Sequence, residues 1–214
     1  MKLNSLSFLD GEAIPDRYAL SRNTSPTTLE PSENLNPHLA WDDVPAGTAS
    51  FALLCADLDA PVDRSRLNDA GATLDADAPR RAFYHWVVVD LPASLREIDE
   101  GAFVPIREHG AAAVRATPPC RQGLNDYADM PGLGRAAGQG YGGPAPPWND
   151  ARPHRYRFTV YALAVPTLAL PPVFRAGDVL DAIRGQVLQE ASLTAIYTLN
   201  ASLAATQVGS PSVT

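Results

Sequence analysis

The order of apolar and polar positions along the chain predicts four strands. Residues 51–58 form an almost continuous apolar run, which is typical of a strand covered on both faces. Residues 84–91 (YHWVVVDL) form a second run, rich in β-branched and aromatic side chains. Residues 156–165 alternate between apolar and polar positions, as a strand with one buried face does. Residues 193–199 predict a last strand.

One helix is predicted over residues 178–191, because apolar residues recur there at helical spacing and Asp178 can act as its N-cap. Residues 63–81 carry both charge signs and several alanines, so they predict a surface excursion between the first two strands. Residues 20–38, rich in Ser, Thr, Asn and Pro, predict an irregular connection. Residues 101–139 are mixed in character and give no clear assignment.

These elements predict a mostly β protein with a few peripheral α-helices. The chain has 214 residues, which is enough for one domain with a single core, expected over residues 1–205. Residues 206–214 are expected to be a flexible tail. The 20 prolines also favour strands and loops over a helical bundle.

Composition excludes several classes of function. A net charge of −7 argues against a nucleic-acid-binding surface. No stretch approaches 18 uninterrupted apolar residues, so no membrane span is expected, and the first residues do not resemble a signal peptide. Cys55 and Cys120 lie far apart in sequence and indicate neither a disulfide framework nor a zinc motif. We therefore expect a cytoplasmic protein.

The most informative stretch is the loop Tyr141–Pro147, which is followed by His154 and Tyr156. Its glycines and prolines exclude a helix or a central strand. Small residues let backbone amides approach a ligand closely, and the imidazole and phenol add directed hydrogen bonds. His154 and Tyr156 are two residues apart on a predicted strand and therefore share a face. The loop and the strand together predict a small anion site.

Other polar residues can be read in two ways. Asp57 and Asp59 are also two residues apart, and Pro61 ends their strand, so they predict either a carboxylate pair at a ligand or a solvated strand end. His85 lies in an apolar strand, where the residue alone favours a hydrogen-bonded core histidine over a ligand contact. His154 and Tyr156, taken alone, can equally form a structural pair.

Two catalytic alternatives have less support from the residues. The histidines lack the local spacing of a zinc site, so no metal is expected. No serine lies in a G-x-S-x-G turn, which argues against a Ser-His-Asp hydrolase. No cofactor is predicted.

Nine short motifs follow one another along nearly the whole chain. They are residues 8–11 (FLDG), 14–15 (IP), 36–41 (NPHLAW), 44–48 (VPAGT), 57–61 (DLDAP), 85–89 (HWVVV), 125–127 (NDY), 141–147 (YGGPAPP) and 154–163 (HRYRFTVYAL). Any one of them is weak, but their order and spacing together resemble those of the phosphatidylethanolamine-binding protein (PEBP) family, and more closely its bacterial branch, the Raf kinase inhibitor-like proteins of the YbhB/YbcL type.

The resemblance implies a β-sandwich of a large and a small sheet, with a small pocket that holds anionic groups. It also implies a set of ligand-binding residues, namely Asp57, Asp59, Pro61, His85, Gly143, Ala145, His154 and Tyr156. In this interpretation two imidazoles, a phenol and a loop amide donate to a phosphate oxygen. The 63–81 excursion joins two of the motifs and is expected to border the pocket mouth.

The function that the resemblance implies is non-enzymatic binding of a phosphate or a phospholipid headgroup, with possible modulation of a partner kinase or protease. The alternative is a hydrolase or isomerase that uses the same His and Asp residues as acid and base. Bacterial relatives often pair, so a homodimer is also expected.

Overall fold

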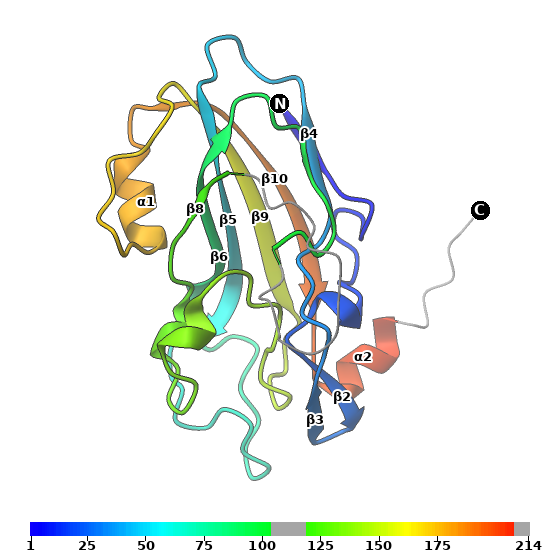
Figure 1. The fold of residues 1–214 in the computed structure, drawn as a ribbon. Helices are drawn as coiled ribbons and strands as arrows, with labels where there is room; N and C mark the ends of the chain where they lie inside the picture. The colour runs from blue at the N-terminus through cyan, green and yellow to red at the C-terminus, as the bar shows by residue number, and fades with distance from the viewer. Residues whose placement is uncertain (104–118, 208–214) are drawn as a thin grey trace, which may run out of the picture.

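The fold was analysed in a computed structural model, which describes residues 1–103 and 119–207 (Figure 1). Most of its regular structure is strand. The strands are β1 (Lys2–Asn4), β2 (Ser21–Ser25), β3 (Thr28–Pro31), β4 (Leu39–Asp42), β5 (Ser50–Pro61), β6 (Arg80–Pro92), β7 (Glu97–Ile98), β8 (Arg121–Gln122), β9 (His154–Leu163) and β10 (Val187–Tyr197). The helices are α1 (Ala176–Ala182) and α2 (Ala201–Gln207), with short 3-10 turns at Asp16–Tyr18, Asp126–Asp129 and Arg135–Gly138.

The described strands form two sheets and a hairpin, and their pairing is antiparallel. The large sheet has the order β10-β9-β5-β6-β8, the small sheet has the order β1-β4-β7, and β2 pairs with β3. Strand β5 is central in the large sheet and nearly all of its residues are buried, as its continuous apolar run predicts. The predicted mostly β fold with few helices is confirmed.

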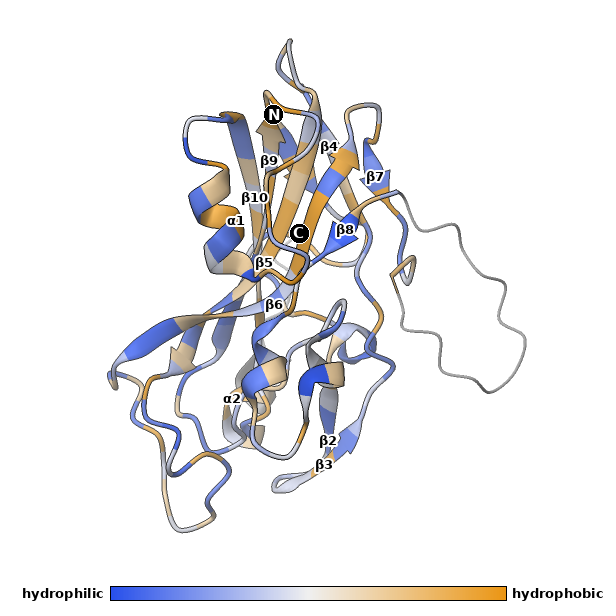
Figure 2. Ribbon diagram, turned by 60° about the vertical axis from the view of Figure 1, so that its left-hand side comes forward, coloured by the Kyte–Doolittle hydropathy of each residue, from blue (hydrophilic) through white to orange (hydrophobic). Residues whose placement is uncertain are grey.

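The large sheet is covered on both faces. On one face the main core packs between the two sheets and includes Trp41 of β4, Phe51 of β5, Trp86 of β6 and Phe158 of β9. On the other face a second cluster joins the large sheet to α1 through Val179. Figure 2 shows α1 on one side of the large sheet and β4 with β7 on the other. This arrangement is the predicted sandwich of a large and a small sheet.

The predicted helix over 178–191 is wrong in its second half. Helix α1 ends at Ala182, and the chain turns through Gly185 at a φ of 73° before it enters β10. Residues 187–191 then pair with β9, which provides hydrogen-bond partners for the backbone N–H and C=O groups along the edge of β9. The helical spacing of the apolar residues is overridden by this sheet pairing. Asp178 lies in the first turn, and its carboxylate accepts from the Arg175 amide at 2.8 Å.

Two other segments contain more structure than their sequence indicates. Within residues 20–38, which are predicted to be irregular, β2 and β3 form a hairpin. Within residues 101–139, the described part contains β8 and two 3-10 turns, while residues 104–118 lie outside the description. Of the predicted tail, residues 206 and 207 belong to α2, and residues 208–214 lie outside the description.

The loop of residues 141–147 packs closely against the turn that precedes β2. The Leu20 amide donates to the Pro144 carbonyl at 2.9 Å. A Cβ atom on Gly143 would lie only 2.2 Å from the Tyr18 carbonyl oxygen, so only glycine fits at this position. The small residues of the Gly-Gly-Pro segment therefore let the 141–147 loop pack directly against residues 18–20.

We predict that Gly143→Ala lowers the free energy of unfolding by about 1–3 kcal/mol, the usual cost of overpacking a rigid site. Urea denaturation of the variant and the parent measures this difference. Gly177→Ala is the matched control, because Gly177 lies in α1 and a Cβ there would meet nothing within 4 Å. Equal unfolding midpoints for Gly143→Ala and the parent would contradict the close packing.

Candidate functional site

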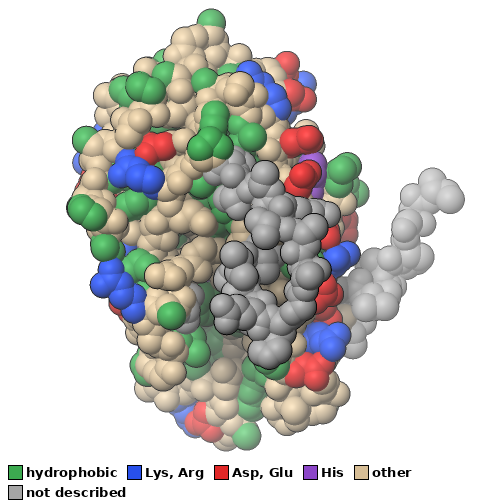
Figure 3. Space-filling model, viewed as in Figure 1, with side chains coloured by type: hydrophobic (Ala, Val, Ile, Leu, Met, Phe, Trp, Pro, Cys, Tyr) green, Lys and Arg blue, Asp and Glu red, His purple; other side chains and the backbone are tan. Residues whose placement is uncertain are grey.

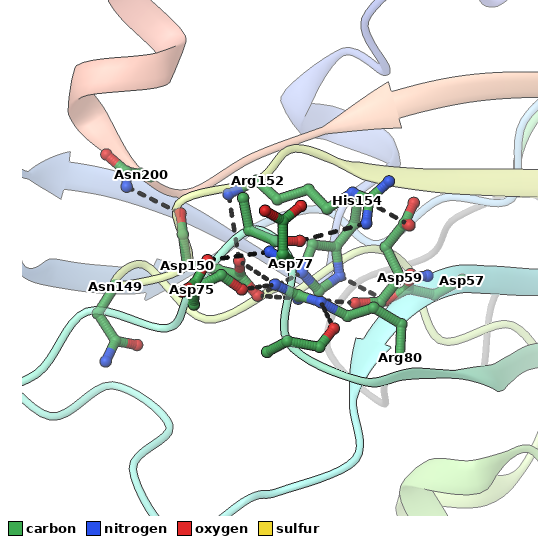
Figure 4. Close-up of polar contacts among 12 residues, drawn as sticks. Asp57, Asp59, Asp75, Asp77, Arg80, Asn149, Asp150, Arg152, His154 and Asn200 are labelled. Atoms are coloured by element: carbon green, nitrogen blue, oxygen red, sulfur yellow. Dashed lines mark hydrogen bonds and ion pairs between the residues drawn. The ribbon is translucent and has the colours of Figure 1, made fainter.

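The site is built around the buried imidazole of His154, which lies between two carboxylates (Figure 4). Its Nδ1 lies 2.7 Å from an oxygen of Asp57, and its Nε2 lies 3.0 Å from an oxygen of Asp150. Carboxylates accept hydrogen bonds, so an imidazolium that donates from both nitrogens satisfies this geometry. Burial alone lowers the pKa of His154, but the hydrogen bonds to Asp150 and Asp57 outweigh it and raise the pKa to about 9.

A second cation completes this cluster from the start of β6. The guanidinium of Arg80 pairs with both oxygens of Asp150, and its Nη2 lies 3.0 Å from Oδ1. Burial raises the pKa of Asp150, but the hydrogen bonds from His154 and Arg80 lower it by more. The pKa of Asp150 therefore lies below its ordinary value. Asp57, His154, Asp150 and Arg80 thus form a chain of alternating charges that balance.

Asp59 turns away from this chain toward two arginines. Its carboxylate accepts from the Arg155 backbone amide at 2.9 Å and from the Arg155 side chain, and it lies 3.3 Å from Nε of Arg152. Burial raises the pKa of Asp59, but the hydrogen bonds from Arg155 outweigh this effect and lower the pKa. The register shifts between Asp57 and Ala60, so the expected shared face of the two aspartates is not formed.

A pocket of about 90 Å³ lies next to the His154 cluster, at the end of the large sheet where β5 ends. Its wall is formed by residues that are far apart in the sequence. They are Asp57, Ala60, Pro61, Arg64, Leu67, Asn68, Phe83, His85, Tyr127, Met130, Ala145, Pro146, Pro147, His154 and Tyr156. Six of the eight predicted site residues therefore meet here, and Asp59 and Gly143 do not line the pocket.

His85 is held by the glycine loop in a single tautomer. Its Nδ1 lies 2.6 Å from the Gly142 carbonyl oxygen, which can only accept, so Nδ1 carries the proton. Burial lowers the pKa of His85 and outweighs the carboxylate of Asp57 and the loop carbonyls, which raise it, so the ring is neutral. Its Nε2 is then a lone-pair acceptor, and it has no partner among the described residues.

The hydroxyl of Tyr156 is the second buried polar atom of the pocket wall without a partner in the described chain. The Tyr156 side chain is fully buried, and its ring lies 5.1 Å from the His85 ring, edge to face. The rings of Phe83 and Tyr127 also pack against the His85 ring. Buried polar groups are almost always hydrogen-bonded, so two unsatisfied ones at one pocket indicate a place for a ligand.

Gly143 has a structural position behind the wall rather than in it. Its amide donates to Asn34 Oδ1 at 2.7 Å, and its carbonyl accepts from the Tyr127 hydroxyl at 2.9 Å. Both backbone groups are therefore occupied. Ala145 lines the pocket, as the resemblance implies.

The connection between β5 and β6, residues 62–79, borders the pocket as expected. Arg64, Leu67 and Asn68 contribute to its wall. The connection is fastened to the turn before β9 by Asn149, whose side-chain amide donates to the carbonyls of residues 66, 69 and 72 and whose Oδ1 accepts from the Asn68 amide at 2.9 Å.

Several of these residues were not singled out from the sequence. Asp150 lies four positions before His154, and this spacing was the available signal for it. Tyr127 falls in the 125–127 motif but had no assigned role. Nothing in the sequence connects Arg80 or Arg64 to the site, because their positions depend on the path of the 62–79 connection.

These features define an antiparallel β-sandwich with a small, partly polar pocket at one end of its large sheet. The sequence model of the family described as phosphatidylethanolamine-binding protein matches residues 4–198. The chain belongs to this family.

Proteins of bacteria are similar to the chain over most of its length. A UPF0098 protein of Aquifex aeolicus is 34% identical over 197 residues, covering 92% of this chain and 88% of the relative. The UPF0098 protein YbhB of Escherichia coli is 32% identical over 197 residues, covering 92% and 99% of the two chains. The similarity therefore extends over most of each chain.

A solved structure of the same family agrees with the fold. The crystal structure of Escherichia coli YbcL, described as a member of the mammalian PEBP family, superposes with a TM-score of 0.67 at 25% identity. The match covers 92% of this chain and 97% of YbcL. The predicted family and fold are thus both confirmed.

The charge on His154 makes stability depend on pH. The pKa of His154 is about 9 in the folded chain and 6.5 in an unfolded reference. The stabilisation is therefore fully present below pH 6.5, declines as pH rises and is lost above the folded pKa. We predict that the His154 ring resonances, followed by NMR, titrate well above those of a free histidine. A ring that titrates at or below the reference value would contradict the imidazolium.

Proposed function

We propose that this chain is a non-enzymatic binding protein whose pocket takes a small anionic group, such as phosphate or a phospholipid headgroup. The observation that carries the proposal is that two buried atoms at one pocket, His85 Nε2 and Tyr156 Oη, have no hydrogen-bond partner among the residues that the structure describes. A buried polar group without a partner costs roughly 1–3 kcal/mol, and a ligand that bonds to it recovers that cost.

The size of the pocket supports a small polar group. Sites for drug-sized ligands have volumes of roughly 300–1000 Å³, and this pocket has a volume of about 90 Å³. That space suits a headgroup, while the remainder of a larger ligand would lie outside. On the face of the molecule that Figure 3 shows, most of the visible Lys and Arg side chains lie beside Asp or Glu and form no continuous basic patch.

The alternative of acid–base catalysis finds less support in the geometry. A general base needs a free lone pair near the substrate, but both nitrogens of His154 already face carboxylates. Asp57 accepts from His154 and from the Asp59 amide, so it is also engaged. His85 keeps a lone pair and can accept a proton, which makes it the residue on which an enzymatic alternative depends.

Other parts of the functional interpretation stay predictions. They are modulation of a partner kinase or protease, pairing into a homodimer, and a cytoplasmic location. In the part of the chain that the structure describes, no helix is long and apolar enough to cross a membrane. Among residues 1–103 and 119–207 no group of three or more His, Cys, Asp or Glu is arranged to hold a metal ion.

We predict that the parent binds inorganic phosphate saturably and that Tyr156→Phe weakens this binding by about 0.5–1.5 kcal/mol, the net value of one hydrogen bond. Calorimetric titration measures both affinities. Tyr141→Phe is the matched control, since the Tyr141 hydroxyl donates to the Tyr18 carbonyl at 2.9 Å and Tyr141 does not line the pocket.

A screen of phosphate monoesters for turnover separates the two functions. The proposal expects no hydrolysis above background. Turnover that disappears in His85→Gln would establish the enzymatic alternative, and equal phosphate affinity in Tyr156→Phe and the parent would place the ligand elsewhere.

A further inference from the structure

An anion in this pocket needs a cation that is not already neutralised, and the positive groups near His154 do not meet this need. His154 itself donates to Asp57 and Asp150. Arg80 is paired in a bidentate manner with Asp150 and is almost completely buried. The charges of these four side chains cancel, so the chain of charges offers an anion no net attraction.

The two arginines before and after His154 are also paired. Arg155 contacts both oxygens of Asp59, and Arg152 lies 3.3 Å from the same carboxylate. Neither of them lines the pocket. The neutral ring of His85 presents a lone pair there and cannot donate from Nε2. The expectation that both imidazoles donate to the anion therefore does not match the hydrogen bonds of the structure.

Arg64 is the remaining cation of the pocket wall. Its guanidinium lies 5.5 Å from the centre of the Phe83 ring, and its Nη1 lies 3.5 Å from the Met130 sulfur. In residues 1–103 and 119–207 it has no carboxylate partner. The neighbouring Asp63 carboxylate accepts from the Ser65 amide instead.

The position of Arg64 is defined by the fold rather than left to a free loop. The 62–79 connection that carries it is fastened to Asn149 by four hydrogen bonds, and the Asn68 side chain accepts from the Trp148 amide at 2.9 Å. Stacking on Phe83 further restricts the guanidinium. Since the chain carries a net charge of −7, its overall field repels anions, and a local cation at the pocket has to supply the attraction.

We propose that Arg64 is the residue that recognises the charge of the ligand, because it holds an oxyanion at the pocket wall. The neutral acceptor His85 Nε2 and the Tyr156 hydroxyl then contact the uncharged or hydrogen-bearing part of the same group. This inference rests on the proposed function and names its specificity-determining residue. It selects ligands that combine a negative oxygen with a hydrogen-bond donor, as a singly protonated phosphate does, whether free or as a monoester.

The test compares phosphate affinity in the parent, Arg64→Gln and Arg64→Lys. Loss of a hydrogen bond from a charged group weakens binding roughly tenfold to a hundredfold, so this loss is expected for Arg64→Gln, with an intermediate effect for Arg64→Lys. Trimethyl phosphate, which carries no charge, serves as a second probe. It offers neither a negative oxygen nor a hydrogen-bond donor, so the parent and Arg64→Gln should bind it equally and both more weakly than the parent binds phosphate.

Arg66→Gln is the matched control, since Arg66 lies on the same connection, is exposed and pairs with Asp69. Its phosphate affinity should equal that of the parent. If Arg64→Gln binds phosphate as the parent does, or loses both probes equally, Arg64 does not recognise the charge and this inference fails. The proposed function stands in that case if Tyr156→Phe still weakens phosphate binding. If the parent itself binds no phosphate, the proposed function fails instead.

Discussion

The charged imidazole of His154, which donates one hydrogen bond to each of two buried carboxylates, is the group on which the rest of the site depends. It joins Asp57 at the end of β5 to Asp150 before β9, and Arg80 extends the chain to the start of β6. Removing one partner from a buried ion pair typically costs about 3–5 kcal/mol, because the other charge stays buried without compensation. Three segments distant in sequence are therefore held together at one end of the large sheet, and the pocket lies beside them.

In the proposed function this cluster positions the pocket residues and is not itself the contact for the anion. Its charges balance internally, and the pocket wall beside it carries two neutral groups, on His85 and Tyr156, that have no partner within residues 1–103 and 119–207. The same turn that presents Asp150 also presents Asn149, which fastens the connection carrying Arg64. In the proposed function the structural charges and the ligand contacts are thus separate, and in the part of the chain that the structure describes Arg64 is the pocket cation without a carboxylate partner, which would let a chain of net charge −7 attract an anion.

The sequence predicted the four long strands β5, β6, β9 and β10, because a continuous apolar run such as that of β5 has few alternatives, but it did not predict the short strands β1–β4, β7 and β8. It predicted a helix through residues 187–191, where pairing with β9 prevails, since periodicity within a segment carries no information about a neighbouring strand edge. The motifs also predicted most of the pocket wall. They could not predict the partners of His154 or the position of Arg64, because hydrogen bonds between distant residues depend on how the 62–79 connection folds back.

The most direct test compares two crystal structures, one of the parent and one of Tyr156→Phe, each from a crystal soaked in phosphate in the same way. The account predicts one phosphate in the pocket of the parent, in contact with the Tyr156 hydroxyl and the Arg64 guanidinium, with His154 still between Asp57 and Asp150. It predicts lower occupancy in the variant. A phosphate bound only at Arg152 or elsewhere on the surface, with the pocket empty, would contradict it.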